Sequence, residues 1–203
     1  YLGWFVKNFS WEPKKGTLVK TPGVVYAIAM AVKAFSKEGD GVIIQQPVYY
    51  PFSEMILSNN RKLINSPLVI KDGRYEMNFE DFEKKIVENQ VKLFILCSPH
   101  NPVGRVWSKE ELKRIGDICI KHNVVIFSDE IHADFVYPGN KHTVFASLGE
   151  EYAANSVIAT APSKSFNIAG LQVSNIFIEN KKLKDAFKNE IVKSGYSQMN
   201  TMG

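Results

Sequence analysis

Residues 155–178 read NSVIATAPSKSFNIAGLQVSNIFI, and the single charged side chain in this stretch is Lys164. In the whole chain, by contrast, 23% of the residues are Asp, Glu, Lys or Arg. An ammonium group buried between two apolar runs without a partner costs several kcal/mol and tends to lose its proton. We therefore expect Lys164 to have a chemical role. The structural alternative is a side chain that extends along the surface into water.

The two apolar runs belong to a series of short apolar runs that alternate with longer amphipathic segments. This alternation is typical of βα units, and continuous apolar runs are typical of buried parallel strands. The sequence therefore predicts an α/β fold, a mainly parallel mixed sheet with helices on both faces. The expected strands are 41–45, 61–65, 93–97, 124–127, 156–160 and 174–178.

Capping residues mark the expected helices. Ser108 and Glu111 form a capping box at the start of one amphipathic segment. The other helix signals are the cap Asn78, the segment 180–194 before Gly195, and the segment that follows Gly23 and exits at Gly39.

The composition fits one large cytoplasmic domain. With 203 residues, 45% of them hydrophobic, the chain can bury a substantial core. The net charge of +4 comes from lysines scattered among acids without a binding motif, so we expect no nucleic-acid partner. The apolar run 24–32 is too short to cross a bilayer, and two cysteines make no disulfide framework. We expect no metal site and no membrane contact.

Polar residues follow four of the expected strands. They are Tyr49 after strand 41–45, Asn101 after 93–97, Asp129 after 124–127 and Lys164 after 156–160. Ligands of open α/β sheets bind at the carboxyl ends of the strands, so we expect these side chains on one rim. Each alone has an ordinary structural explanation, such as a turn for Asn101 or a cap for Asp129. Their coincidence at one edge of the sheet is harder to explain in that way.

Together these side chains have the chemistry of a pyridoxal 5'-phosphate (PLP) site. A lysine amine forms a Schiff base with the cofactor, and a carboxylate beside the pyridine nitrogen keeps that nitrogen protonated. A tyrosine ring stacks on the cofactor, and an asparagine binds its hydroxyl oxygen. Free backbone amides at a helix N-terminus hold its phosphate. The sequence thus predicts PLP as the cofactor.

Four motifs carry a resemblance to a known family. They are TPGVVYAIAMAVKAF (21–35), SPHNPVGRVWSKEEL (98–112), SDEIHADFVY (128–137) and APSKSFNIAGLQVSN (161–175). By these motifs the chain resembles the class I and II PLP enzymes of fold type I, and closely their cystathionine β-lyase branch, the C–S lyases. The resemblance covers essentially the whole chain.

The resemblance implies a role for each residue of the rim. Lys164 is the expected Schiff-base lysine, Asp129 the partner of the pyridine nitrogen and Tyr49 the stacking ring, and these three are the expected catalytic residues. Asn101 is expected to bind the ring hydroxyl. The expected phosphate ligands are Gly23, Val24, Val25 and Ser163. The family also implies cis peptide bonds before Pro47 and Pro102.

Two positions depart from the aminotransferase pattern. His132 stands where many aminotransferases have a tyrosine bonded to the ring hydroxyl, and Gln172 stands where many have a phosphate-binding arginine. The histidine is typical of the C–S lyase branch and is an expected cofactor ligand; the alternative is a loop histidine packed at a dimer edge. Without the arginine, the phosphate depends more on backbone amides.

The resemblance also implies that residues 1–203 are the PLP-binding large domain alone. Relatives carry an N-terminal segment, and a C-terminal small domain whose arginine binds the substrate carboxylate. The expected parent is a homodimer, and this piece by itself is expected to be nearly inactive.

The implied reaction is β-elimination from cystathionine or a cysteine-like amino acid, giving a thiol, ammonia and pyruvate. The alternatives are a PLP-dependent aminotransferase, which needs a 2-oxo acid acceptor, and a PLP-binding regulatory module. A nicotinamide-binding domain is disfavoured because no G-x-G-x-x-G follows an expected strand.

Overall fold

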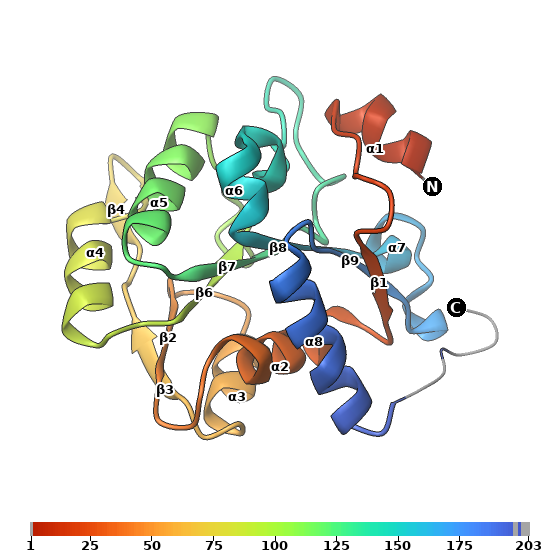
Figure 1. Cartoon of the computed structure of the whole chain (residues 1–203). Helices are drawn as coiled ribbons and strands as arrows, with labels where there is room; N and C mark the ends of the chain where they lie inside the picture. The colour runs from red at the N-terminus through yellow and green to blue at the C-terminus, as the bar shows by residue number, and fades with distance from the viewer. Residues whose placement is uncertain (1, 197–198, 200–203) are drawn as a thin grey trace.

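A seven-stranded sheet forms the centre of the computed structural model, which describes residues 2–196 and Met199 (Figure 1). In spatial order the strands are β1 (Leu18–Thr21), β9 (Ser174–Phe177), β8 (Ser156–Thr160), β7 (Val125–Asp129), β6 (Leu93–Cys97), β2 (Gly41–Ile44) and β3 (Lys62–Asn65). Only β9 runs against the others, pairing antiparallel with β1 and β8. The mainly parallel sheet is thus confirmed, and each of the six expected strands is present within two residues of its predicted ends.

Helices cover both faces of this sheet (Figure 1). The first face carries α1 (Leu2–Phe9), α4 (Phe79–Glu88), α5 (Lys109–Lys121) and α6 (Glu150–Ala154), and the second carries α2 (Val24–Phe35), α3 (Pro51–Leu57) and α8 (Lys181–Lys193). Side chains alternate between the faces, so that Phe94 packs on the first face and Ile95 on the second. This two-sided burial explains why the strands are continuously apolar.

Several smaller elements were not expected from the sequence. They are the edge strand β1, the hairpin of β4 (Val69–Lys71) and β5 (Arg74–Glu76), the helices α1, α3, α6 and α7 (Pro162–Ser165), and the 3₁₀ turns η1 (Phe145–Leu148) and η2 (Ala169–Leu171). Strands β1 and β4 are four and three residues long and largely exposed, so neither forms a buried apolar run.

The predicted caps are confirmed at atomic level. The Ser108 hydroxyl accepts the Glu111 N–H at 3.1 Å, and the Glu111 carboxylate accepts the Ser108 N–H at 2.7 Å. One boundary was wrong, because α2 ends at Phe35 and not at Gly39. The Ser36 hydroxyl donates to the Val32 carbonyl at 2.5 Å, and the chain leaves the helix in an extended conformation.

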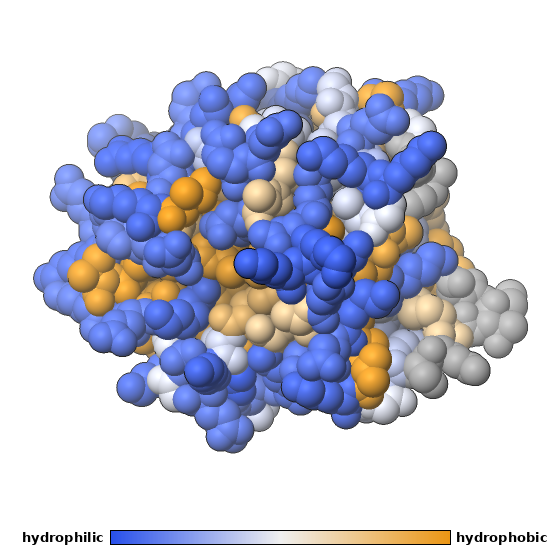
Figure 2. Space-filling view, viewed as in Figure 1, coloured by the Kyte–Doolittle hydropathy of each residue, from blue (hydrophilic) through white to orange (hydrophobic). Residues whose placement is uncertain are grey.

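The face seen in Figure 2 is mostly hydrophilic. Lys181, Lys182 and Lys188 of α8 are exposed to solvent. In the described part of the chain, no helix is long and apolar enough to cross a membrane. The same residues contain no group of His, Cys, Asp or Glu suited to hold a metal ion.

Gly116 of α5 packs closely against the segment of η1 and α6, and its replacement by Ala should destabilise the fold. An added Cβ would lie 2.7 Å from the Tyr152 ring, whose hydroxyl is fixed by a 2.5 Å hydrogen bond to Asp117. Overpacking of this kind costs about 1–3 kcal/mol. Gly3→Ala in α1 is the control, because nothing lies within 4 Å of its Cβ position and both variants gain helix propensity. Equal free energies of unfolding by urea for the two variants would contradict the packing described.

Candidate active site

The four residues expected on the rim follow four consecutive strands of the sheet, β2, β6, β7 and β8. Each lies at or beyond the carboxyl end of its strand, and Asp129 is itself the last residue of β7. Asp129 pairs with Cys97 of β6 on one side and with Ala159 of β8 on the other. The carboxylate is therefore held at the middle of the rim by the ladder of the sheet.

A cavity of about 160 Å³ at this rim brings together seven of the nine expected site residues. These seven are Gly23, Val24, Val25, Tyr49, Asp129, Ser163 and Lys164. They come from the N-terminus of α2, the loop after β2, the end of β7, and α7. The structure thus gathers residues that are far apart in sequence, while the role of each remains a prediction.

Asp129 is only 4% exposed and lies on the α2 face of the sheet. Its Oδ1 accepts the Ile131 N–H at 3.2 Å. Burial raises the pKa of Asp129 to about 7, while the positive charge of Lys164 acts in the opposite direction. A buried carboxyl of this kind gains from a cation beside it, so it suits a partner such as a protonated pyridine nitrogen.

The N-terminus of α2 borders the same cavity. Gly23 has φ 158° and ψ 162°, a conformation that residues with a side chain rarely adopt, and no side chain caps the helix. The first backbone N–H groups of α2, beginning with Val24 and Val25, are thus at the positive end of the helix dipole beside the cavity. This arrangement fits a phosphate dianion.

Lys164 borders the cavity, and its side chain is exposed. The physical reason is its place in α7, a four-residue helix that follows the carboxyl end of β8 and has no buried residue. The apolar runs that flank Lys164 in the sequence are β8 and β9, and both are buried. The link between them lies outside the sheet.

Tyr49 lies in the loop after β2, with its ring edge against Phe52 at a centroid distance of 6.2 Å. Burial raises its pKa, with smaller contributions from neighbouring negative charges, including Asp129. The phenol therefore stays neutral, which suits a ring that stacks and is not required to ionise.

Asn101 and His132 line a neighbouring cavity of about 470 Å³ and not the one with Lys164. The Asn101 N–H donates to Cys97 Sγ at 3.3 Å, which fixes the backbone of its loop. Burial lowers the pKa of His132, and the charge of Lys164 lowers it further, so the two side chains are electrostatically coupled. The expected roles of Asn101 and His132 as ligands of the ring hydroxyl remain predictions.

The peptide bonds before Pro47 and Pro102 are cis, as expected. A third cis bond, between Ser98 and Pro99, was not expected.

Gln172 was not among the predicted ligands, yet it lines the cavity with Lys164 and Gly23. It follows η2 in a left-handed conformation, with φ 49°, which turns the chain back toward β9. The sequence signal for Gln172 is its distance of eight residues from Lys164, the position at which the aminotransferase pattern has an arginine. Its amide can bind an anion in place of that arginine.

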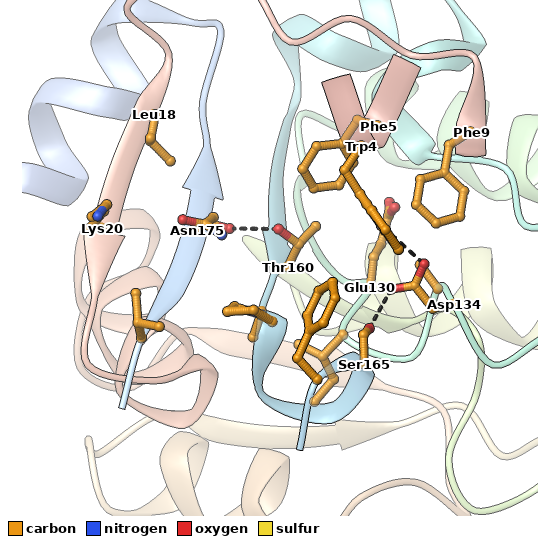
Figure 3. A pocket seen from close by; sticks show the side chains of 16 residues that line it. Trp4, Phe5, Phe9, Leu18, Lys20, Glu130, Asp134, Thr160, Ser165 and Asn175 are labelled. Carbon is orange, nitrogen blue, oxygen red and sulfur yellow. Dashed lines mark hydrogen bonds between the residues drawn. The ribbon is translucent and has the colours of Figure 1, made fainter. Parts of the chain in front are cut away.

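A different cavity, of about 550 Å³, is mainly apolar (Figure 3). Its lining includes the aromatic side chains of Trp4, Phe9 and Phe166, and it does not include Lys164, Asp129 or Tyr49 of the rim. At its edge Asp134 accepts hydrogen bonds from Trp4 Nε1 at 3.2 Å and from the Ser165 hydroxyl (Figure 3). These bonds connect α1 and the residue after Lys164 to the loop that carries His132.

Comparisons with known proteins show the family of the chain. The sequence model of the family described as aminotransferase class I and II matches residues 7–200. Cystathionine beta-lyase PatB from Bacillus subtilis (strain 168) is 46% identical over 198 residues, which are 98% of this chain and 51% of that protein. Aspartate aminotransferase from Geobacillus stearothermophilus is 31% identical over 170 residues, 82% of this chain and 42% of that protein.

The solved structures give the same result. Cystalysin from Treponema denticola, whose crystal structure contains a pyridoxal 5'-phosphate cofactor, matches with a TM-score of 0.96 and 43% sequence identity. The match covers 99% of this chain and 51% of that one, so the chain spans about half the length of cystalysin and of PatB. With the family model matched over almost the whole sequence, the chain belongs to the class I and II aminotransferase family.

Proposed function

We propose that the chain is the PLP-binding large domain of a C–S lyase, which eliminates a thiol from cystathionine or a cysteine-like amino acid. The observation that carries this proposal is the cavity in which Lys164, Asp129 and the N-terminus of α2 meet. An amine, a buried carboxylate and an uncapped helix N-terminus match the aldehyde, the ring nitrogen and the phosphate of PLP. The similarity to PatB and to cystalysin supports the same reading.

When bound, PLP withdraws electrons from the substrate α-carbon and so favours loss of its proton and of the sulfur group on the β-carbon. The residues of the chain supply binding and proton transfer. Lys164 Nζ would hold the cofactor and would serve as the base that takes the substrate α-proton. Asp129 would keep a proton on the pyridine nitrogen. Tyr49 would cover one face of the ring and exclude water from it.

The phosphate is held by the backbone amides of Val24 and Val25, with Ser163 and Gln172 as side-chain ligands. The four-residue helix α7 places Ser163 directly before Lys164, so the phosphate ligand and the amine share one rigid turn. Asn101 and His132 line the neighbouring cavity and would bind the ring hydroxyl from there.

We further propose that residues 1–203 belong to a longer cytoplasmic protein that works as a homodimer. The length of the relatives, of which the chain spans about half, supports the longer protein. The group that binds the substrate carboxylate is then outside these residues, and the 203-residue piece alone should be nearly inactive. Loss of substrate positioning can raise the barrier by several kcal/mol.

The protein at its full natural length should release pyruvate from cystathionine without any 2-oxo acid. A coupled lactate dehydrogenase assay measures this directly, with and without added 2-oxoglutarate. The expected result is the same rate in both conditions, because elimination consumes no amino-group acceptor. Turnover that appears only with the 2-oxo acid would favour the aminotransferase, the alternative that the similarity to aspartate aminotransferase supports. PLP binding without any turnover would favour a regulatory module.

A further inference from the structure

His100 joins two of the loops at the cofactor rim. The residue is 2% exposed, and its Nε2 lies 3.0 Å from the carbonyl oxygen of Pro47, 53 residues away in sequence. A carbonyl oxygen can only accept a hydrogen bond, so Nε2 carries the proton and donates it. The imidazole therefore connects the loop after β6 to the loop after β2.

Each of these loops carries a residue of the proposed site. Tyr49 follows Pro47 by two residues, and Asn101 directly follows His100. The ladder between β2 and β6 pairs Val42–Ile43 with Leu93–Phe94, which leaves the last three residues of β6 outside it. At the carboxyl ends of these strands, where the cofactor loops begin, the bond from His100 to Pro47 makes the connection.

The ring of His100 is itself held in place. It meets the Trp107 ring edge-on, with centroids 5.5 Å apart and planes at 90°. Trp107 is 1% exposed, and its Nε1 donates to the Cys97 carbonyl at 2.9 Å. The His100 N–H donates to the Arg105 carbonyl at 2.8 Å. Both the ring and the backbone of His100 are therefore fixed to the end of β6 and to the turn that follows it.

The burial of the ring also affects its charge state. Burial lowers the pKa of His100 to about 4. The imidazole is therefore neutral at physiological pH, with its proton on Nε2, and the link to Pro47 persists over the range in which PLP enzymes are assayed.

We propose that His100 is a positioning residue of the cofactor site, which holds the loop of Tyr49 against the loop of Asn101. The stacking ring and the ligand of the ring hydroxyl then approach PLP in one fixed relative placement. This inference rests on the proposed function, since it assigns a role toward the same cofactor. His100 itself touches no reacting atom.

The test compares His100→Gln with His100→Asn in the protein at its full natural length. The Gln amide reaches the place of Nε2 and can donate to Pro47, whereas the Asn amide reaches only the place of Nδ1. The two variants otherwise share the same chemistry. His122→Gln is the control, because His122 is a partly buried histidine at the end of α5 whose Nε2 contacts Glu83. The readouts are the Kd for PLP and the circular dichroism of the bound cofactor, which reports the orientation of its ring.

We expect His100→Asn to raise the Kd for PLP about tenfold and to change the circular dichroism of the bound cofactor, because a buried carbonyl loses its donor. His100→Gln should restore both to within about threefold of the parent, and His122→Gln should match the parent. Variants that bind PLP equally well and with equal circular dichroism would contradict the role of His100. A parent that fails to bind PLP would instead contradict the proposed function.

A measurement on the unmodified protein keeps the inference testable if a variant does not fold. In ¹⁵N NMR, His100 should show the neutral Nε2–H tautomer between pH 5.5 and 8. The Nδ1–H tautomer, or a ring that gains a proton within this range, would exclude the bond to Pro47.

Discussion

Replacement of Lys164 by Ala is expected to abolish turnover and to leave no cofactor covalently bound. Lys164 is the lysine that lines the cavity with Asp129 and the N-terminus of α2, and no other lysine in the described residues does so. Its loss removes both the covalent attachment of PLP and the base for the α-proton. The rate of pyruvate release should fall by at least about a thousandfold, about 4 kcal/mol of barrier.

The matched control for this variant is Lys182→Ala. Lys182 is exposed on α8, away from the rim. The Lys182→Ala variant should keep the rate of pyruvate release and the visible absorption of bound PLP within about twofold of the parent. A Lys164→Ala variant that still formed a borohydride-stable adduct would refute the assignment of Lys164.

Asp129→Asn should slow turnover by a hundredfold to a thousandfold, about 3–4 kcal/mol of barrier. The Asn side chain keeps an oxygen for the Ile131 N–H, so the fold should survive. It lacks the charge that holds a proton on the pyridine nitrogen, so the cofactor withdraws electrons less strongly. A full-length variant with a rate within about threefold of the parent would show that Asp129 does not have this role.

A pH series without PLP gives an independent check on Asp129. Burial raises its pKa to about 7 in the folded chain, against about 4 when unfolded. The folded state therefore binds the extra proton between these values, and its stability falls as pH rises through them. An Asn side chain does not titrate, so Asp129→Asn lacks this pH dependence. The melting temperature of the variant minus that of the parent should therefore increase from pH 4 to 7 and stay constant above pH 7. A constant difference would mean that the carboxylate is not buried as described.

The sequence was sufficient to predict the sheet because its central strands are buried on both faces. Residues 93–97 are apolar throughout, and residues 156–160 are apolar between Ser156 and Thr160; short runs of this kind between turn signals favour buried strands. The edge strand β1 was not predicted because it is not buried on both faces. It contains Lys20, and Thr21 is its only buried residue.

The site could be predicted in part. Asp129 and Lys164 lie at or just beyond the carboxyl ends of strands that the sequence predicts. Their positions at the rim could therefore be predicted from the topology of the sheet alone. The exposure of Lys164 could not be predicted, because it depends on where the short helix α7 projects beyond β8. The separation of Asn101 and His132 from the cavity of Lys164 depends on loop conformation after β6 and β7, which local sequence does not determine.

We propose that PLP binds at this rim through Lys164. Borohydride reduction of the PLP-loaded protein, followed by peptide mass spectrometry, tests this binding directly. We expect a pyridoxyl group on Lys164 and on no other lysine. A pyridoxyl group fixed to a different lysine, or a protein that cannot be labelled at saturating PLP, would contradict it.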